Sequence, residues 1–472
     1  MKKAAAVPFI IMIILLFSDV CTAGVREIIK SGEQWGGIYI GGKKAGYCMT
    51  RLEDAPGGYK ITDWMRMSLK KMGTGQMVYS VTTEYTDASF NLKSFEMRLS
   101  GGGSELLERG VVEGAVLKLE IVSGGVTRKT DVDVGLSPHA DSDMDFFFLL
   151  NNPEPGSKGK VRYFDTNRAR MDDMELAVEA VEQSEYMGMP TGAIRIRQTC
   201  SGISATHWFS PDHGSLRVEM PMGMTIVSES REMAEAEVSA KDAPGDFALN
   251  NSIPVGVKIS EPRKVESLSI RLSGVSADGL SLDGDGQQFA MGVVTVKAVR
   301  QSFIKPCIMP VTDDSVSDWL KPEPFIQSDD PGIIAKAAEI TGGEKDLRKA
   351  ARMICDWVYR SMAKSYQTAT PSAVEILKNP RGDCRDHTAL YVALARSAGI
   401  PAREAFGIVL YDGRFYYHAW PEVYLGEWVA ADPTFGIFPA DAARVRFVYG
   451  DDKRLALLNL FGKLKVEVLD WR

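Results

Sequence analysis

The stretch "RGDCRDHTALYVALARSAGIPAR", residues 381–403, places a cysteine between a Gly-Asp turn and a pattern typical of a buried helix. The predicted helix starts near Cys384 and ends at Gly399, which is followed closely by Pro401. The positive end of a helix lowers the pKa of a thiol, and its backbone amides can form an oxyanion hole. Cys384 is therefore either a nucleophile or a small apolar residue at the start of a buried helix.

The residues around this stretch predict a mixed α+β region. Apolar residues at three- and four-residue spacings indicate helices over 333–340 and 346–365, and Pro371 begins a shorter one. After Pro401, residues 402–434 alternate apolar and polar positions and break at Asp412-Gly413 and near Gly426, which is typical of an antiparallel meander.

A nucleophilic cysteine needs a base, and the chain offers five histidines: His139, His207, His213, His387 and His418. A turn centred on Leu425 would pair residues whose numbers sum to 850, which sets Asp432 beside His418. The carboxylate could then fix one ring nitrogen while the other faces Cys384. His387 shares a helix face with Cys384, but two side chains from one turn leave little room for a carbonyl between them. Both Cys384 and His418 could also be packing residues.

Three motifs carry a resemblance. The order Gly382-Asp383-Cys384-Arg385-Asp386, then "ALARSAGIPAR", then "HAWPEVYLGEWVAADPT" is similar to the core of the transglutaminase-like superfamily. The resemblance implies a papain/transglutaminase-like catalytic domain over 326–472, with Cys384 as nucleophile, His418 as base and Asp432 as orienting carboxylate. It implies structural roles for five accompanying positions: Asp386, Arg403, Trp420, Glu422 and Trp428.

The implied activity is that of a cysteine hydrolase or acyltransferase. The enzyme would form a thioester on a peptide or protein substrate and pass the acyl group to water or to an amine, with hydrolysis favoured. The expected oxyanion donors are the backbone N–H of Cys384 and one further group, for which Tyr366, Gln367 and Asn379 are near in sequence. No cofactor and no metal are expected, because the cysteines lack CxxC spacing and the acidic runs lack a calcium-loop pattern.

The rest of the chain predicts a multidomain protein. Residues 24–240 read as a large antiparallel β domain built from hairpins, and residues 252–325 as a small β-sandwich-like domain. The stretch "WFSPDHGSLRVEMPMG", residues 208–223, resembles the curved, half-open barrels of periplasmic lipoprotein carriers, which implies room for an apolar ligand. The alternative function is therefore a periplasmic ligand- or peptide-binding protein with a non-catalytic transglutaminase-like scaffold. A wide apolar cleft in the β domain and a Cys384 enclosed away from solvent would favour it.

The first 23 residues have the pattern of a signal peptide. Lys2 and Lys3 precede an apolar run over 4–17, and small residues close the segment at Ala23. Cleavage after Ala23 predicts a periplasmic or extracellular protein. The formal net charge of −7 gives no electrostatic footprint for nucleic acid. Loss of Cys21 leaves five cysteines, and the sequence carries no signal for an oligomeric state.

Overall fold

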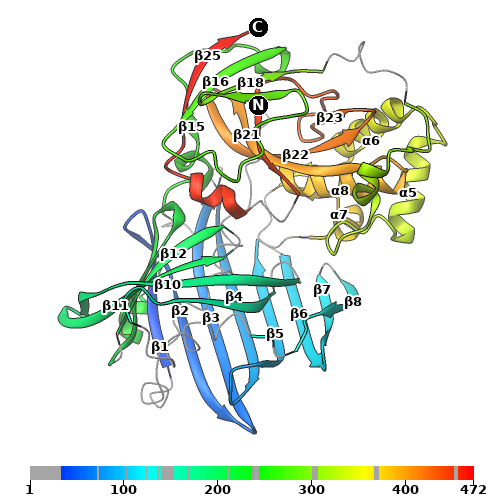
Figure 1. Cartoon of the computed structure of the whole chain (residues 1–472). Helices are drawn as coiled ribbons and strands as arrows, with labels where there is room; N and C mark the ends of the chain where they lie inside the picture. The colour runs from blue at the N-terminus through cyan, green and yellow to red at the C-terminus, as the bar shows by residue number, and fades with distance from the viewer. Residues whose placement is uncertain are drawn as a thin grey trace. The chain divides into compact units, whose positions relative to one another are not determined.

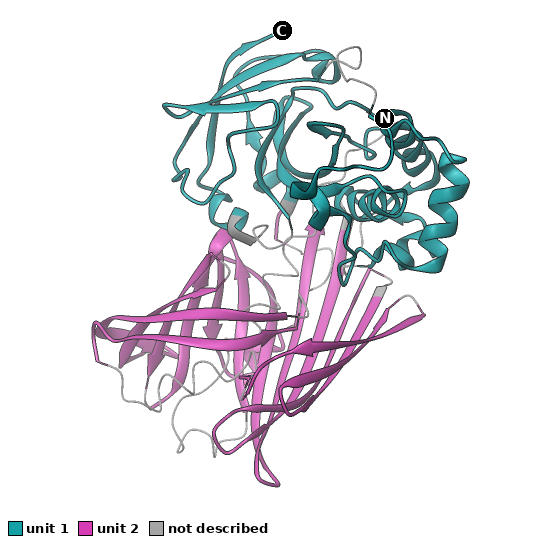
Figure 2. Cartoon of the chain, turned by 45° about the vertical axis from the view of Figure 1, so that its right-hand side comes forward, with its two compact units in different colours: residues 1–7, 247–472 teal, residues 8–246 magenta. Residues whose placement is uncertain are grey.

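A computed structural model describes residues 33–472, except for 72–73, 103, 124, 137, 140–153, 167–169, 201, 211, 237, 239–243, 300–306, 366–370 and 451–454. The predicted signal segment lies outside the described residues. The chain divides between residues 246 and 247 into two compact units (Figure 2), which we name the β unit and the core unit. No described helix combines the length and the apolar character needed to span a bilayer.

The β unit confirms the predicted large antiparallel sheet. Its described strands form one fourteen-stranded sheet in the order β8-β7-β6-β5-β4-β3-β2-β1-β14-β13-β12-β11-β10-β9. Hairpins join most neighbours, as the Gly and Asn breaks between alternating segments predict. The strands are β1 (Glu33–Ile40), β2 (Lys43–Ala55), β3 (Gly58–Lys71), β4 (Thr74–Asp87), β5 (Leu92–Gly101), β6 (Ser104–Glu113), β7 (Val116–Ser123), β8 (Val126–Asp133), β9 (Lys158–Asp165), β10 (Arg170–Tyr186), β11 (Met189–Cys200), β12 (Ile203–Ser210), β13 (Gly214–Met220) and β14 (Met224–Ser228).

The sheet of the β unit curves back on itself. Phe95 on β5 and Phe164 on β9 have ring centroids 5.6 Å apart, although many strands separate them along the sheet. Alternate side chains point to the enclosed face, where apolar residues such as Met174, Leu176 and Ile196 are almost completely buried. A short helix, α3 (Arg231–Ala234), packs against β1 and β2.

The core unit contains the predicted helices and meander. The helices are α4 (Phe247–Asn250), α5 (Pro331–Thr341), α6 (Leu347–Ser361), α7 (Ala373–Lys378) and α8 (Cys384–Ser397). A five-stranded sheet has the order β15-β22-β21-β24, with β23 also paired to β22. Its strands are β15 (Ile253–Pro254), β21 (Ala402–Tyr411), β22 (Arg414–Tyr424), β23 (Trp428–Ala430) and β24 (Arg444–Tyr449).

A second sheet of the core unit joins distant parts of the chain. It has four strands in the order β17-β18-β16-β25. Three come from the segment predicted as a small sandwich, and the fourth is the last strand of the chain. The strands are β16 (Ser267–Ser273), β17 (Gln287–Ala290), β18 (Val293–Lys297) and β25 (Lys465–Trp471). The predicted boundary between residues 325 and 326 falls inside the compact core unit and stays a prediction.

Helix α8 lies among the other helices of the core unit, beside β22 (Figure 1). Helices α5, α6 and α7 pack against it, and it packs in turn against β21 and β22. All its residues from Cys384 to Arg396 are buried. A helix covered on every side explains why the stretch 381–403 is so rich in small and apolar residues.

Candidate active site

Cys384 is the first residue of α8, and two acidic side chains fix the start of that helix. Asp383 is the N-cap residue, and its side chain accepts a hydrogen bond from Arg385 N at 2.9 Å. Asp386 completes a capping box, since its Oδ2 accepts from Asp383 N at 2.9 Å. The local sequence therefore holds Cys384 at the positive end of a 14-residue helix, where the helix dipole favours a thiolate.

Position 382 requires glycine because the side chain of Asp386 lies against the backbone there. A Cβ atom on Gly382 would lie 2.1 Å from Oδ2 of Asp386, so any other residue would disturb the capping box. The same segment, β20 (Arg381–Gly382), pairs in parallel with β19 (Ala363–Lys364). Ser365 N also donates to Gly382 O at 3.1 Å. The turn before the cysteine is therefore held by backbone pairing on one side and by the helix cap on the other.

His418 and Asp432 are joined by a buried hydrogen bond. His418 lies on β22 opposite Gly407 of β21, and its ring packs beside that of Phe435 with centroids 5.4 Å apart. The distance between Nε2 of His418 and Oδ2 of Asp432 is 2.9 Å. Because the carboxylate accepts the proton on Nε2, Nδ1 is the ring nitrogen left to exchange a proton with a reacting group.

The predicted strand register that brought these two residues together is wrong by two positions. Strands β22 and β23 pair with numbers that sum to 852, as with Glu422 opposite Ala430, whereas a turn centred on Leu425 predicted 850. Strand β23 ends before Asp432, which lies in the following loop. The carboxylate thus reaches His418 from a loop and is not its cross-strand neighbour.

Asp432 accepts hydrogen bonds from four donors. Its Oδ1 accepts from the backbone N–H groups of Thr434 at 3.1 Å and Phe435 at 3.3 Å. Its Oδ2 accepts from His418 and from Nη1 of Arg444, the latter at 2.5 Å. Burial alone would raise the pKa of Asp432, but the charges and hydrogen bonds of His418 and Arg444 hold it well below its usual range. The carboxylate is therefore ionised at neutral pH and its orientation is fixed.

The helix that begins at Cys384 packs against the strand that carries His418 (Figure 1). The structure therefore places the predicted nucleophile and base on adjoining elements of one unit. Both residues are enclosed, with exposed fractions of 0% for Cys384 and 2% for His418. An enclosed Cys384 is one of the two features expected of a non-catalytic scaffold, so it bears directly on function.

His387, the alternative candidate for the base, forms a hydrogen bond with the N-cap residue of α8. Its Nδ1 lies 2.7 Å from the carbonyl oxygen of Asp383, and because a carbonyl only accepts, Nδ1 carries the proton. Nε2 has no hydrogen-bond partner among the described residues. Burial lowers the pKa of His387, which keeps the ring neutral.

The other three histidines are not part of the core unit. His139, His207 and His213 belong to the β unit, where the His213 ring stacks on Tyr186 at 4.2 Å.

In the part of the chain that the structure describes, no three His, Cys, Asp or Glu side chains are grouped to hold a metal ion. None of the five described cysteines forms a disulfide. Of the suggested oxyanion donors, Tyr366 and Gln367 lie outside the described residues, and Asn379 Oδ1 accepts from Arg381 Nε at 2.9 Å.

The accompanying motif residues make structural contacts. Arg403 donates through Nε and Nη2 to Oε2 of Glu422, at 2.8 and 2.6 Å. The Arg403 guanidinium also lies 3.9 Å from the ring centroid of Trp428 and 4.2 Å from that of Tyr449. These contacts tie β21, β22, β23 and β24 together around the strand that bears His418.

Sequence reasoning missed Arg444 and Asp441. Arg444 opens β24 and is 3% exposed, and it bridges the Asp432 and Asp441 carboxylates. The available signal was the pattern Arg-Val-Arg at 444–446, which puts two arginines into an otherwise apolar strand. Buried arginines require carboxylate partners, and that rule pointed to an ion-pair network.

Comparison with known proteins gives three kinds of similarity. Residues 334–433 match the family model described as the transglutaminase-like superfamily. An uncharacterized protein of Haemophilus influenzae is 34% identical over 121 residues, which cover 24% of this chain. The chain spans only 32% of the length of that relative.

Solved structures are similar at low identity. A proposed cysteine protease from Cytophaga hutchinsonii is 17% identical, with a TM-score of 0.30 over 44% of this chain and 86% of that one. A β-barrel-like protein with a domain of unknown function from Brucella abortus is 9% identical, with a TM-score of 0.32 over 42% of this chain and 94% of that one. These TM-scores are too low to bear on function.

The matched residues run from α5 to the loop that holds Asp432, and they include Cys384 and His418. The chain therefore carries, at residues 334–433, a domain of the transglutaminase-like superfamily.

Proposed function

We propose that the core unit is a cysteine enzyme that breaks amide bonds of peptides or proteins, with Cys384 as nucleophile, His418 as base and Asp432 as orienting carboxylate. The observation that carries this proposal is the 2.9 Å hydrogen bond from His418 to a fully buried, ionised Asp432. That bond leaves Nδ1 of His418 to act on a thiol, and the strand of His418 packs against the helix that begins at Cys384.

The reaction has two steps. The Cys384 thiolate attacks the carbonyl carbon, the C–N bond breaks, and imidazolium His418 gives its proton to the leaving amine, which leaves a thioester. Water then attacks the thioester while His418 accepts its proton, the C–S bond breaks, and a carboxylic acid leaves. If an amine replaces water in the second step, the product is a new amide. We favour hydrolysis, because water needs no second binding site.

Two groups of the helix start assist this chemistry. The backbone N–H of Cys384, the first residue of α8, is the oxyanion donor in this proposal, because the N–H groups of Arg385 and Asp386 already donate to the Asp383 side chain. The capping box of Asp383 and Asp386 fixes that turn and so fixes the direction of the Cys384 N–H.

Secretion belongs to the same proposal. The segment that ends at Ala23 has the pattern of a cleaved signal peptide, so we place the enzyme in the periplasm or outside the cell, where its substrate would be an extracytoplasmic peptide or protein. Room for an apolar ligand in the β unit likewise stays a prediction.

A second candidate function is a binding protein whose core unit is only a scaffold. The specific observation in its favour is the enclosure of Cys384, which is 0% exposed. For an enzyme, the same enclosure requires that the site opens before substrate reaches the thiol. The two functions therefore differ in whether Cys384 can be reached and activated in the folded protein.

Alkylation by iodoacetamide at pH 6 separates the two functions. The full chain is labelled, the modified cysteines are mapped by mass spectrometry, and wild type is compared with His418→Ala. We expect Cys384 to react much faster than an ordinary thiol and to lose that advantage in His418→Ala.

Cys355 on the neighbouring helix α6 is an internal comparison. It too is fully buried, and burial together with the Asp432 charge raises the pKa of its thiol. Labelling of Cys384 no faster than of Cys355, or labelling that does not depend on His418, would refute the catalytic proposal and favour the scaffold.

A further inference from the structure

Arg444 bridges two buried carboxylates behind the His418–Asp432 pair. Its Nη1 donates to Oδ2 of Asp432 at 2.5 Å, and its Nη2 donates to Oδ2 of Asp441 at 2.8 Å. Its Nε donates to the carbonyl oxygen of Asp441 at 3.1 Å. The guanidinium is 3% exposed, so these contacts are shielded from solvent and held in a fixed fork geometry.

Arg444 and His418 donate to the same oxygen of Asp432. Oδ2 is the acceptor in both hydrogen bonds, while Oδ1 is occupied by backbone N–H groups. The arginine therefore fixes the position of Oδ2 and shares its negative charge with the imidazole. A permanent positive charge at that oxygen also opposes a second positive charge on His418.

Asp441 is the second carboxylate partner of Arg444. Its Oδ2 lies 2.8 Å from Arg444 Nη2 and 3.2 Å from Nη1 of Arg263, and its Oδ1 accepts from Ala443 N at 2.9 Å. Asp432, Asp441, Arg444 and Arg263 together form a neutral group of four charges.

Other titratable groups surround this network and remain the same in the variants proposed below. Helix α8 contributes Cys384 and the neutral His387, and α6 contributes Cys355, whose Sγ donates to Ile437 O at 3.6 Å. Strand β19 contributes Lys364, whose charge lowers the pKa of His387. Because these groups are unchanged, a change in the pKa of His418 on substitution of Arg444 is due to the loss of Arg444.

We propose that Arg444 is a positioning residue that holds the Asp432 carboxylate in place for His418 and limits the positive charge the imidazole carries, and that Asp441 sets the strength of this effect. The inference rests on the proposed function for its catalytic meaning, but the electrostatic coupling can be measured without any activity.

The direct test is a titration of His418 by NMR. The chain has five histidines, so labelling with histidine carrying ¹³C at Cε1 gives few signals, and His418→Gln identifies the one that belongs to His418. In Arg444→Gln we expect the pKa of His418 to rise by about one unit, a tenfold change in its protonation equilibrium, because a neighbouring like charge is removed. In Asp441→Asn we expect the opposite shift, since Arg444 loses a neutralising partner.

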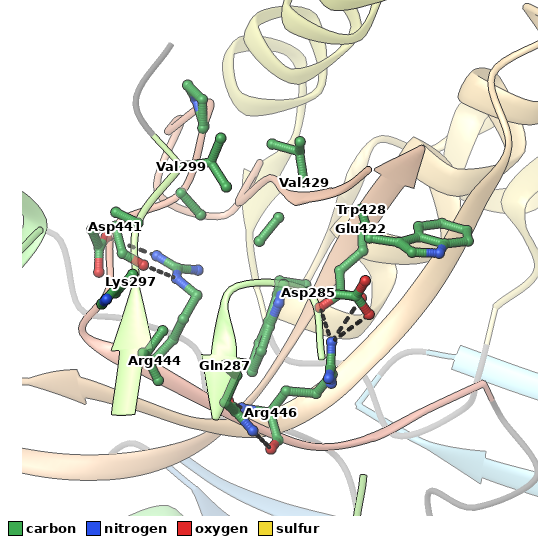
Figure 3. Close-up of a pocket in the computed structure, with 16 residues that line it drawn as sticks. Asp285, Gln287, Lys297, Val299, Glu422, Trp428, Val429, Asp441, Arg444 and Arg446 are labelled. Carbon is green, nitrogen blue, oxygen red and sulfur yellow. Dashed lines mark hydrogen bonds and ion pairs between the residues drawn. The ribbon is translucent and has the colours of Figure 1, made fainter. Parts of the chain in front are cut away.

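Arg446→Met is the matched control. Arg446 lies two residues along the same strand, is also 3% exposed and lines the same pocket as Arg444 (Figure 3). Its partners are Glu422 and Asp285, so its loss removes a buried arginine without touching Asp432. We expect the pKa of His418 to change by less than about 0.3 unit in this variant, because charges farther than the first contact are much weaker.

The outcomes distinguish this inference from the proposed function. An unmoved His418 pKa in both Arg444→Gln and Asp441→Asn, or an equal shift in Arg446→Met, overturns the role of Arg444. If Arg444→Gln does not fold, the downward shift in Asp441→Asn decides, because a merely structural Asp441 would not move it. Iodoacetamide labelling is measured in parallel. Shifted His418 titration with an unreactive Cys384 supports the coupling and refutes the enzyme, whereas a reactive Cys384 with an unshifted His418 refutes only the coupling.

Discussion

Replacement of Asp432 by asparagine tests the site most directly, because the change keeps the shape of the side chain and removes its charge. The asparagine oxygen can keep the two backbone N–H bonds that Oδ1 accepts in the native protein. Its NH₂ group then faces Nη1 of Arg444 and the N–H of His418, so donors meet donors where Oδ2 was the acceptor.

The expected loss of stability follows from the burial of this group. Asp432 is 0% exposed, and the removal of one partner from a buried ion pair costs about 3–5 kcal/mol. Arg444 keeps its contacts with Asp441, so we expect a loss of about 3 kcal/mol, near the lower limit. The expected loss of reactivity is larger. In the proposed mechanism, His418 would adopt the tautomer with its proton on Nδ1, which would lower turnover by a factor on the order of 10³–10⁴.

Hydrogen exchange followed by mass spectrometry measures the stability change in the core unit alone. A loss of about 3 kcal/mol corresponds to exchange roughly a hundredfold faster in peptides from β22 and β24, since 1.4 kcal/mol is about tenfold. Peptides from the β unit serve as the reference within the same sample. The comparison variant is Asp285→Asn, whose carboxylate also meets two arginines but is 26% exposed, so we expect a loss below about 1 kcal/mol.

The pH dependence gives the sign of the effect. The folded-state pKa of Asp432 is depressed, so its charge stabilises the native protein above the unfolded-state pKa of about 4, and this contribution is lost as the pH falls further. The difference between wild type and Asp432→Asn should therefore be full at pH 7 and smaller at pH 3. Exchange within about fivefold of wild type at pH 7, or a difference that is the same at both pH values, would show that the Asp432 network does not have the energetic role given to it.

Two further predictions concern other features of the fold. Gly382→Ala should destabilise the start of α8 by more than about 1 kcal/mol and slow the alkylation of Cys384, because the alanine Cβ would lie 2.1 Å from Asp386 Oδ2. The control is Gly256→Ala, which should leave the labelling of Cys384 unchanged, because no atom lies within 4 Å of the added Cβ. In the β unit, burial and then the charge of Asp165 raise the pKa of Glu108 to about 8, so the wild type should lose stability as the pH rises from about 4 to 8. Thermal melts at pH 5 and pH 9 should show that Glu108→Gln removes this loss, and equal pH dependence in both proteins would contradict it.

The secondary structure of the core unit could be predicted in some detail, because its signals are local. The spacing of Leu347, Ala350 and Ile354 marks the buried face of α6, and all three are completely buried. Asp412-Gly413 marks the hairpin between β21 and β22, and both residues have positive φ angles. The start of α8 at Cys384 was predicted from Gly382 and Asp383 for the same reason.

Contacts between separate elements were harder to predict from the sequence. The sequence predicted that Asp432 meets His418, but through a register that is wrong by two residues, because the loop after β23 and not the ladder brings the carboxylate to the ring. The joining of β25 to β16 in one sheet was not predicted either, since almost two hundred residues separate the two strands and no local pattern encodes their pairing.

The sequence by itself determined which residues could react: a cysteine at a helix start, a histidine in an aromatic strand and an aspartate predicted on the next strand, together with the family that these motifs resemble. Only the tertiary structure decided which nitrogen of His418 is bound, that Arg444 and Asp441 stand behind Asp432, and that Cys384 is enclosed. The physical reason is that propensity, capping and turn chemistry act over a few residues. Burial and buried charge instead depend on side chains brought together from four separate elements, and their energies are set by that environment.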